Sequence, residues 1–253
     1  MTADPRAHAF NSAAAQYAAS RPAYPPELLD TVEEFLQRPL AEVRAADIGA
    51  GTGIATRLLR RRGADVIAVE PGEAMADRFR RTLPEVPLVR GDGNALPLAT
   101  ASRDLLTYAQ SWQWTDTTRS VPEAMRVLGS GGALAVWWNT TAFDVPWLRA
   151  QHERIARHCG VPPRPLTRPD DGEAVRRAGL TGLRVTRRQI RWSRVVPLGT
   201  HLDNIGSRSA LLALGTEAMS AFLDEERHRL RALFPDEAVE EVYVADLLVA
   251  ARP

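Results

Sequence analysis

The chain has 253 residues, of which 45% are hydrophobic and 25% are charged, and its formal net charge is +1. This composition is ordinary for a soluble globular protein. The length allows one large domain, or a core domain with an inserted cap. A near-neutral charge offers no basic stripe for phosphates, so we expect no nucleic-acid partner.

Two residue types narrow the chemistry further. All 32 Lys and Arg positions are Arg, which excludes a lysine Schiff base and a lysine general base. Cys159 is the single cysteine, so an intrachain disulfide and a thiolate zinc cluster are both excluded, and we expect no metal site. The N-terminus lacks the apolar core of a signal peptide, and no apolar run approaches the ~20 residues that cross a membrane. We therefore expect a cytoplasmic protein with no membrane partner.

Short apolar runs alternate with amphipathic segments of helical length, which is typical of a parallel α/β sheet. The pattern predicts helices at residues 27–37, 54–62, 73–82, 120–128, 145–159, 201–214 and 216–234. It predicts strands at residues 44–48, 65–70, 86–90, 104–109, 133–138, 183–192 and 241–250. The sequence GSGG at 129–132 is a strong stop signal for the fourth helix.

Three segments stand apart from this alternation, approximately residues 8–26, 139–172 and 196–234. The middle one contains PPRPLTRPDD, whose prolines interrupt regular structure. We interpret the three segments as a largely helical cap on a single doubly wound domain that spans residues 1–253.

The sequence ADIGAGTG at 46–53 lies where the first strand gives way to a helix. Glycine there permits positive φ and a close approach of the backbone to a ligand. The N-terminus of the helix beginning near Ile54 adds free N–H groups and a positive dipole end.

The spacing of this turn discriminates between nucleotide-like ligands. A dinucleotide fingerprint reads G-x-G-x-x-G, but the third position after Gly51 is Ile54. Asp47, two residues ahead of Gly49, would oppose a pyrophosphate and suits a ligand that carries an ammonium group.

Further polar residues follow the second and third strands. Glu70 can accept hydrogen bonds from two ribose hydroxyls, although NAD would use the same device. Pro71 and Met75 are placed to pack on an adenine face, and core packing is the alternative for Met75. After the third strand, Asp92 could accept a bond from an adenine amino group.

Together these motifs resemble a known family. DIGAGTG at 47–53, the pair Glu70–Pro71 and GDGNALP at 91–97 look like the successive cofactor motifs of class I (Rossmann-like) S-adenosylmethionine-dependent methyltransferases. YAASRPAYP at 17–25 and AQSWQW at 109–114 resemble the small-molecule branch related to ubiquinone/menaquinone-type and trans-aconitate methyltransferases. EVYVADLLVA at 241–250 resembles the last strand of that branch, and the resemblance implies a mostly parallel, seven-stranded sheet with an antiparallel last strand.

The resemblance implies S-adenosyl-L-methionine as cofactor. The residues that would bind it are Tyr17, Arg21, Asp47, Gly49, Ala50, Gly51, Thr52, Glu70, Pro71, Met75, Asp92, Gly93, Asn94 and Gln110. Among these, Tyr17 and Arg21 would close over the cofactor from an N-terminal helix. In one respect the chain departs from the pattern, because many relatives have a histidine where Gln113 stands, and a histidine base is missing there.

The acceptor is expected to be a small molecule. Trp112 and Trp114 either wall its pocket or pack in the core, and Asn139 and Arg208 are candidates for touching it. Because methyl transfer from a sulfonium is a direct displacement, we expect alignment to dominate, with no dedicated base. The alternatives are an NAD-dependent oxidoreductase and a non-catalytic S-adenosylmethionine-binding module. Either a monomer or a homodimer is compatible with the sequence.

Overall fold

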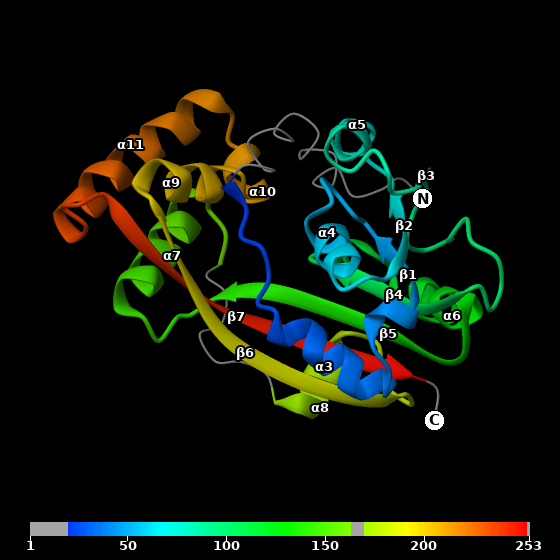
Figure 1. Cartoon of the computed structure of the whole chain (residues 1–253). Helices are drawn as coiled ribbons and strands as arrows, with labels where there is room; N and C mark the ends of the chain where they lie inside the picture. The colour runs from blue at the N-terminus through cyan, green and yellow to red at the C-terminus, as the bar shows by residue number, and fades with distance from the viewer. Residues whose placement is uncertain (1–19, 163–169, 252–253) are drawn as a thin grey trace. The chain divides into compact units, whose positions relative to one another are not determined.

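A computed structural model describes residues 20–162 and 170–251 of the chain. Its centre is a seven-stranded sheet with the strand order β3-β2-β1-β4-β5-β7-β6 (Figure 1). The strands are β1 (Arg44–Ile48), β2 (Asp65–Glu70), β3 (Leu88–Arg90), β4 (Arg103–Ala109), β5 (Leu128–Thr141), β6 (Arg184–Pro197) and β7 (Ala238–Ala251). The first five in this order are parallel, whereas β7 runs opposite to β5. The predicted fold class is therefore confirmed.

Helices connect these strands. They are α3 (Glu27–Leu36), α4 (Ile54–Arg61), α5 (Glu73–Thr82), α6 (Thr117–Val127), α7 (Pro146–His158), α8 (Asp171–Arg177), α9 (Leu198–Gly206), α10 (Ser209–Leu212) and α11 (Thr216–Leu233). Two short 3-10 turns, η2 (Leu40–Glu42) and η3 (Trp112–Trp114), complete the described elements. No helix in the described ranges combines the length and the apolar character that crossing a bilayer requires.

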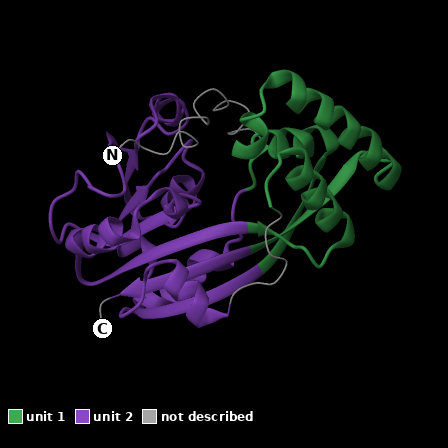
Figure 2. Ribbon diagram, turned by 180° about the vertical axis from the view of Figure 1, so that it is seen from behind, with its two compact units in different colours: residues 1–22, 140–168, 191–244 green, residues 23–139, 169–190, 245–253 purple. Residues whose placement is uncertain are grey.

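By their contacts the described residues form two compact units (Figure 2). Unit 1 contains residues 20–22, 140–162 and 191–244, and unit 2 contains residues 23–139, 170–190 and 245–251. We describe each unit by itself. Whether the segments expected to form a cap act as one stays a prediction.

In unit 2, the strand order brings the polar loops to one edge of the sheet. β1 pairs in parallel with β2 on one side, with Ile48 opposite Val69, and with β4 on the other. Because parallel strands end at the same edge, the loops after all three strands meet there. The chain leaves β1 toward β2 on one side and reaches β4 on the other, so this edge is a topological switch point, where open α/β sheets bind ligands.

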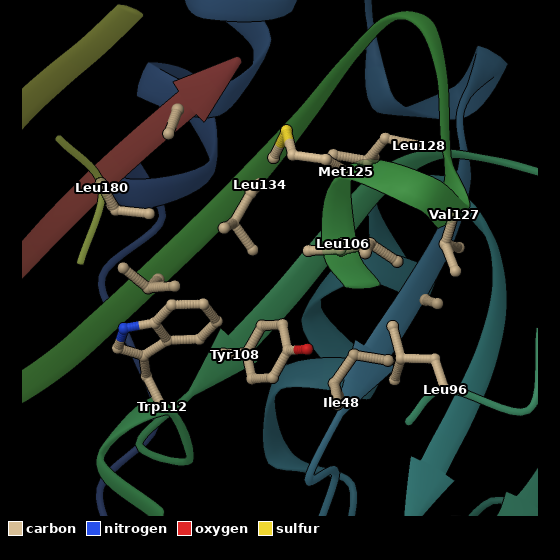
Figure 3. Close-up of a cluster of buried hydrophobic side chains, with 14 of the residues drawn as sticks. Ile48, Leu96, Leu106, Tyr108, Trp112, Met125, Val127, Leu128, Leu134 and Leu180 are labelled. Carbon is tan, nitrogen blue, oxygen red and sulfur yellow. The ribbon is translucent and has the colours of Figure 1, made fainter. Parts of the chain in front are cut away.

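The core of unit 2 lies on both faces of its sheet. On one face, Ile48, Leu106 and Leu134 pack with side chains of α6 and with Leu180 (Figure 3). On the other face, Phe79 of α5 packs against Ala50, Ala68, Leu83 and Val86. Alternate residues of each strand thus face opposite layers, as the pleat requires.

Two predicted boundaries at β3 and β5 were wrong for local reasons. β3 begins at Leu88 because Val86 is in a turn, where its N–H donates to Leu83 O over 3.1 Å, and its side chain is buried. GSGG does end α6, yet these residues also form the first part of β5. There the register jumps from Arg103 opposite Leu128 to Leu105 opposite Ala133, and glycine accommodates such an irregularity.

The later elements also differ from the prediction. β6 extends to Pro197, and the alternation of exposed and half-buried residues continues past 192. The helix expected at 201–214 is divided into α9 and α10 at Ser207 and Arg208. α8 was not predicted, although Asp170 caps it by accepting from the Glu173 N–H over 2.8 Å.

Unit 1 is stabilised by an apolar cluster and by a buried polar network. Helices α9 and α11 supply most of the cluster, which includes Leu202, Phe222 and Leu230. In the network, Glu241 of β7 is 1% exposed. One of its oxygens meets His201 Nδ1 at 2.7 Å, and the other accepts from Arg194 Nε at 2.6 Å.

These cationic and polar partners lower the pKa of Glu241 to about 2, against the opposing effect of burial. Since the folded-state pKa lies below the usual value of 4.5, the stabilisation is present above pH 4.5 and is lost as the pH falls toward 2. We expect Glu241→Gln to lower the free energy of unfolding at pH 7 by about 3 kcal/mol, because the partly buried Arg194 then loses its anion. The difference from wild type, measured by urea denaturation, should shrink on acidification. A difference that stays constant from pH 7 to pH 3 would contradict this assignment.

Candidate functional site

The glycine turn after β1 has the conformation that its composition predicts. Gly49, Gly51 and Gly53 have φ values of +68°, +56° and +88°, in the left-handed region that side chains disfavour. The Gly49 and Ala50 N–H groups donate to Val69 O over 2.8 and 3.1 Å, which fixes the turn to β2. The conformation of the turn is therefore supported by contacts within the protein itself.

The space around the three glycines differs. A Cβ on Gly49 would lie 2.5 Å from Ser111 Cβ, and one on Gly53 would lie 2.5 Å from Leu83 Cδ1. Among the described residues, no atom would lie within 4 Å of a Cβ on Gly51. Gly49 and Gly53 thus allow close packing inside the protein, whereas the described residues leave space beside Gly51 for a ligand against the backbone.

Asp47 lies beneath this turn and is fully buried, with 0% exposure. Thr56 Oγ1 of α4 donates to one carboxylate oxygen over 2.6 Å, and Thr107 Oγ1 of β4 donates to the other over 2.9 Å. Burial raises the pKa of Asp47, and these hydroxyls oppose that effect. The side chain therefore joins the turn's strand, the following helix and β4, and the expected contact between Asp47 and a ligand ammonium stays a prediction.

Glu70 ends β2 and is 6% exposed. Its two oxygens accept from the Gly51 N–H over 2.8 Å and from the Gly72 N–H over 2.6 Å. Desolvation raises the pKa of Glu70, while these backbone donors lower it. A carboxylate has about four acceptor positions, so two remain for hydroxyl donors of a ligand.

The loop after β3 is held by its own side chains. Asp92, an exposed residue, accepts from the Asn94 N–H, and Asn94 Oδ1 accepts from the Asp116 N–H over 2.7 Å. Tyr108 donates from its hydroxyl to Gly93 O over 3.2 Å. A Cβ on Gly93 would lie 3.0 Å from the Tyr108 ring, so this position also needs a small residue. The Asp92 carboxylate remains accessible at the end of the loop.

Gln110, after β4, is one of four described non-glycine residues with positive φ, at +58°. Its N–H donates to Trp137 O over 2.9 Å, and its side-chain amide donates to Asn139 O over 3.3 Å. Ser111 follows and donates from Oγ to Ile48 O over 2.6 Å. Ser111 therefore closes the far side of the glycine turn, a role that no sequence pattern indicated.

The candidate aromatic and apolar residues have different environments. Trp112 is 2% exposed, its Nε1–H donates to Ala178 O over 2.9 Å, and its ring packs edge-on against Tyr108 (Figure 3). The pocket-wall interpretation of Trp112 is thus corrected in favour of core packing. Trp114 is half-buried, Pro71 is exposed, and Met75 is 5% exposed near the start of α5. The structure is compatible with either interpretation of Met75.

The remaining predicted residues are divided between the units. Asn139, in unit 2, donates from Nδ2 to Ala23 O over 2.9 Å. Arg21 and Arg208 are both in unit 1, where the Arg21 guanidinium donates to Ser207 O over 3.0 Å. Tyr17 lies outside the described residues.

All histidines in the described ranges lie in unit 1, and one of them is buried at 2% exposure. His201 Nε2 faces Gln151 Oε1 at 3.1 Å, because the amide nitrogen of Gln151 donates to Glu226 over 3.2 Å. Nδ1 faces Glu241, so both ring nitrogens face oxygen acceptors. His201 is thus enclosed by its own partners within unit 1, which gives this histidine a structural role.

Comparisons with known proteins agree with this arrangement. Residues 46–136 match the methyltransferase domain family. An uncharacterized methyltransferase of Mycobacterium tuberculosis is 35% identical over 222 residues, which are 87% of this chain and 85% of the relative. A proposed type II methyltransferase from Anaeromyxobacter dehalogenans has a similar structure, with a TM-score of 0.62, 22% identity, and coverage of 92% of this chain and 97% of that one. A methyltransferase from Geobacter sulfurreducens, solved with S-adenosyl-L-homocysteine, has a TM-score of 0.56 at 16% identity over 100% of both chains.

The fold and the turn define a Rossmann-like enzyme of class I. The chain belongs to the methyltransferase family, as the order of its motifs predicted, and it is an S-adenosylmethionine-dependent methyltransferase. Family membership decides against the NAD-dependent oxidoreductase.

Two alanine substitutions in the glycine turn should separate folding from binding. Gly49→Ala adds steric overlap with Ser111 to an unfavourable φ and should lower the free energy of unfolding by about 2–4 kcal/mol. Gly51→Ala meets only the φ penalty, about 1–2 kcal/mol, but places its methyl group in the ligand space. We expect Gly51→Ala to remain folded in thermal denaturation and to lose S-adenosylmethionine binding in calorimetry. Normal binding by Gly51→Ala would show that the ligand does not approach this turn.

Proposed function

We propose that S-adenosyl-L-methionine binds along the carboxyl edge of β1, β2 and β4 in unit 2, over Gly51. The observation that carries this placement is the open space at Gly51 beside a carboxylate with spare acceptor capacity. In this arrangement Glu70 accepts from the two ribose hydroxyls, and the loop of Asp92, Gly93 and Asn94 lies toward the adenine. Gln110 borders the site on the β4 side. Among the neighbouring proteins, the one from Geobacter sulfurreducens carries the demethylated cofactor product in its structure.

The residues of the turn fit this cofactor chemically. The Thr52 hydroxyl is buried, and within the described residues it has no hydrogen-bond partner. A buried polar group without a partner is costly, and a ligand with polar atoms at the turn would satisfy it. Asp47 contributes through its charge, which is close enough to Glu70 to raise the pKa of that carboxyl. Both acids therefore favour a ligand with cationic groups, such as the ammonium and sulfonium of this cofactor.

We further propose that the acceptor is a small molecule and that catalysis is mainly alignment. The sulfur–methyl bond breaks as the methyl group passes to the acceptor's nucleophile, and the electron pair of that bond remains on the sulfur. The protein's task is to hold the three atoms in line and to exclude water. Unit 2, which contains the proposed cofactor site, has no histidine among its described residues. Asn139, Trp114 and Arg208 remain proposed acceptor contacts, and the cytoplasmic location and oligomeric state remain predictions.

Replacement of Glu70 tests the cofactor site. In Glu70→Gln the amide nitrogen must face a backbone N–H, either of Gly51 or of Gly72, so two donors oppose each other. We expect the dissociation constant for S-adenosylmethionine to rise at least about tenfold, as measured by isothermal titration calorimetry. The matched control is Glu73→Gln, an exposed neighbour that loses the same charge and should bind normally. Equal affinities for Glu70→Gln and wild type would remove Glu70 from the site.

Catalysis needs a separate experiment, because a module that only binds the cofactor would pass the first test. The protein is incubated with methyl-labelled S-adenosylmethionine and a metabolite extract, and the products are identified by mass spectrometry. Transfer of label to a small molecule by wild type but not by Gly51→Ala supports the proposed activity. If wild type binds the cofactor and labels nothing across extracts, the non-catalytic interpretation is favoured.

A further inference from the structure

Gln113 is an exposed side chain that is held at both ends. It lies in the middle of η3, and its Nε2 donates to Gln110 O over 2.7 Å. Its Oε1 accepts from Trp138 Nε1 over 2.8 Å. An amide has one donor end and one acceptor end, so these two bonds fix its orientation completely. Ordering a glutamine side chain costs up to about 2 kcal/mol of conformational entropy, which these two bonds have to offset.

The carbonyl that Gln113 holds belongs to the most constrained residue of this edge. Left-handed φ for a residue other than glycine costs about 1–2 kcal/mol and persists only where the surroundings enforce it. At Gln110 the N–H and the side chain are bonded to β5, and the carbonyl is bonded to Gln113. Loss of the Gln113 bond would leave the Gln110 carbonyl free to rotate toward an ordinary conformation.

That rotation would be transmitted to the glycine turn. Ser111 is the next residue, and it lies where a Cβ of Gly49 would be, at 2.5 Å. Its hydroxyl is bonded to Ile48 O at the end of β1. A change in the backbone at Gln110 must move Ser111, and Ser111 cannot move without disturbing Ile48 and Gly49.

We propose that Gln113 is a positioning residue for the cofactor site, because its amide clasps the Gln110 carbonyl to the Trp138 indole and so holds Ser111 against the glycine turn. This inference rests on the proposed binding of S-adenosylmethionine at that turn. Gln113 itself touches neither the turn nor the cofactor; it acts through Gln110 and Ser111.

The donor and acceptor groups required at position 113 predict how the cofactor affinity of substituted variants depends on pH. Glutamate at this position accepts from Trp138 but, when ionised, opposes the Gln110 carbonyl with a second acceptor. Protonation near its ordinary pKa of about 4.3 restores a donor. Histidine behaves in the opposite sense: the neutral ring offers one donor and one acceptor, whereas protonation near pH 6.5 removes the acceptor for the Trp138 N–H.

The test measures the dissociation constant of S-adenosylmethionine for wild type, Gln113→Glu and Gln113→His between pH 8 and pH 4.5, always as a ratio to wild type. We expect the ratio for Gln113→Glu to be about tenfold at pH 8 and to fall as the pH decreases. The ratio for Gln113→His should be smallest at pH 8 and should rise below about pH 6.5. Both substitutions are at an exposed position, so the variants should fold, which circular dichroism verifies at each pH.

Two further variants control the experiment. Gln189→Glu adds the same charge at an exposed position on β6 and should leave the ratio at one. Trp138→Phe removes the partner of Oε1, so its effect on binding should not add to that of Gln113→Glu. Ratios that stay flat with pH in both Gln113 variants would overturn the inference while leaving the proposed function intact. Wild type that fails to bind S-adenosylmethionine would instead overturn the proposed function.

Discussion

The geometry of the proposed cofactor site depends on the buried carboxylate of Asp47. Asp47 accepts hydroxyl bonds from Thr56 and Thr107, and so it joins β1, α4 and β4 at the point where the strand order reverses. A buried carboxylate is tolerated only when its oxygens are bonded, because the cost of removing it from water is otherwise several kcal/mol. The hydroxyls of Thr56 and Thr107 therefore have to stay within hydrogen-bonding distance of Asp47, and this requirement fixes the start of α4 relative to the sheet. The glycine turn between β1 and α4 inherits its shape from this constraint.

Hydrogen bonds connect the glycine turn to the ends of the neighbouring strands on both sides. Val69 holds the turn to β2, Glu70 bonds the Gly51 N–H, and Ser111 closes the opposite side from β4. The bonds cross distances of up to 63 residues in the sequence, which only the parallel sheet makes possible. A site built this way is organised before the cofactor binds. Little ordering is then needed on binding, which is the condition under which alignment can carry most of the catalysis.

Unit 1 is organised by a different kind of network. The buried Glu241 carboxylate is bonded to the buried His201 ring and to the half-buried Arg194 guanidinium. Its function in the described residues is to hold three elements, β6, β7 and α9, together. The bonds of His201 to Glu241 and Gln151 give this histidine a structural role. The role proposed for Gln113 is likewise one of positioning.

The positions of several strands and helices, and the conformation of the glycine turn, were predictable from the sequence. These features depend mainly on residues that are close together in the chain. The alternation of apolar runs located the strands, and β1, β2 and α5 begin and end where the pattern placed them. Glycines at 49, 51 and 53 predicted a left-handed turn, since φ is a property of single residues. The spacing and order of the motifs identified the cofactor class. The predicted boundaries of strands and helices were wrong where pairing with a distant segment determines the structure. An example is the start of β5, where the register with β4 is irregular.

Contacts between distant segments were decided by the tertiary structure alone. The sequence predicted that Asp47 contacts a ligand, but it did not predict the partners of this carboxylate inside the protein. In the fold, the two Asp47 oxygens accept hydrogen bonds from the hydroxyls of Thr56 and Thr107. The sequence allowed two interpretations of Trp112, a wall of the acceptor pocket or packing in the core. The hydrogen bond from Trp112 Nε1–H to Ala178 O supports packing in the core. Ser111 carried no signal in the sequence, and Gln113 was noted only as a departure from the family pattern. Their hydrogen bonds to Ile48 and Trp138 depend on strands that are distant in the sequence. The sequence by itself determined the methyl donor and the shape of its turn; which side chains face that turn was decided only when the strands came together, because burial and hydrogen-bond partners are properties of the assembled sheet.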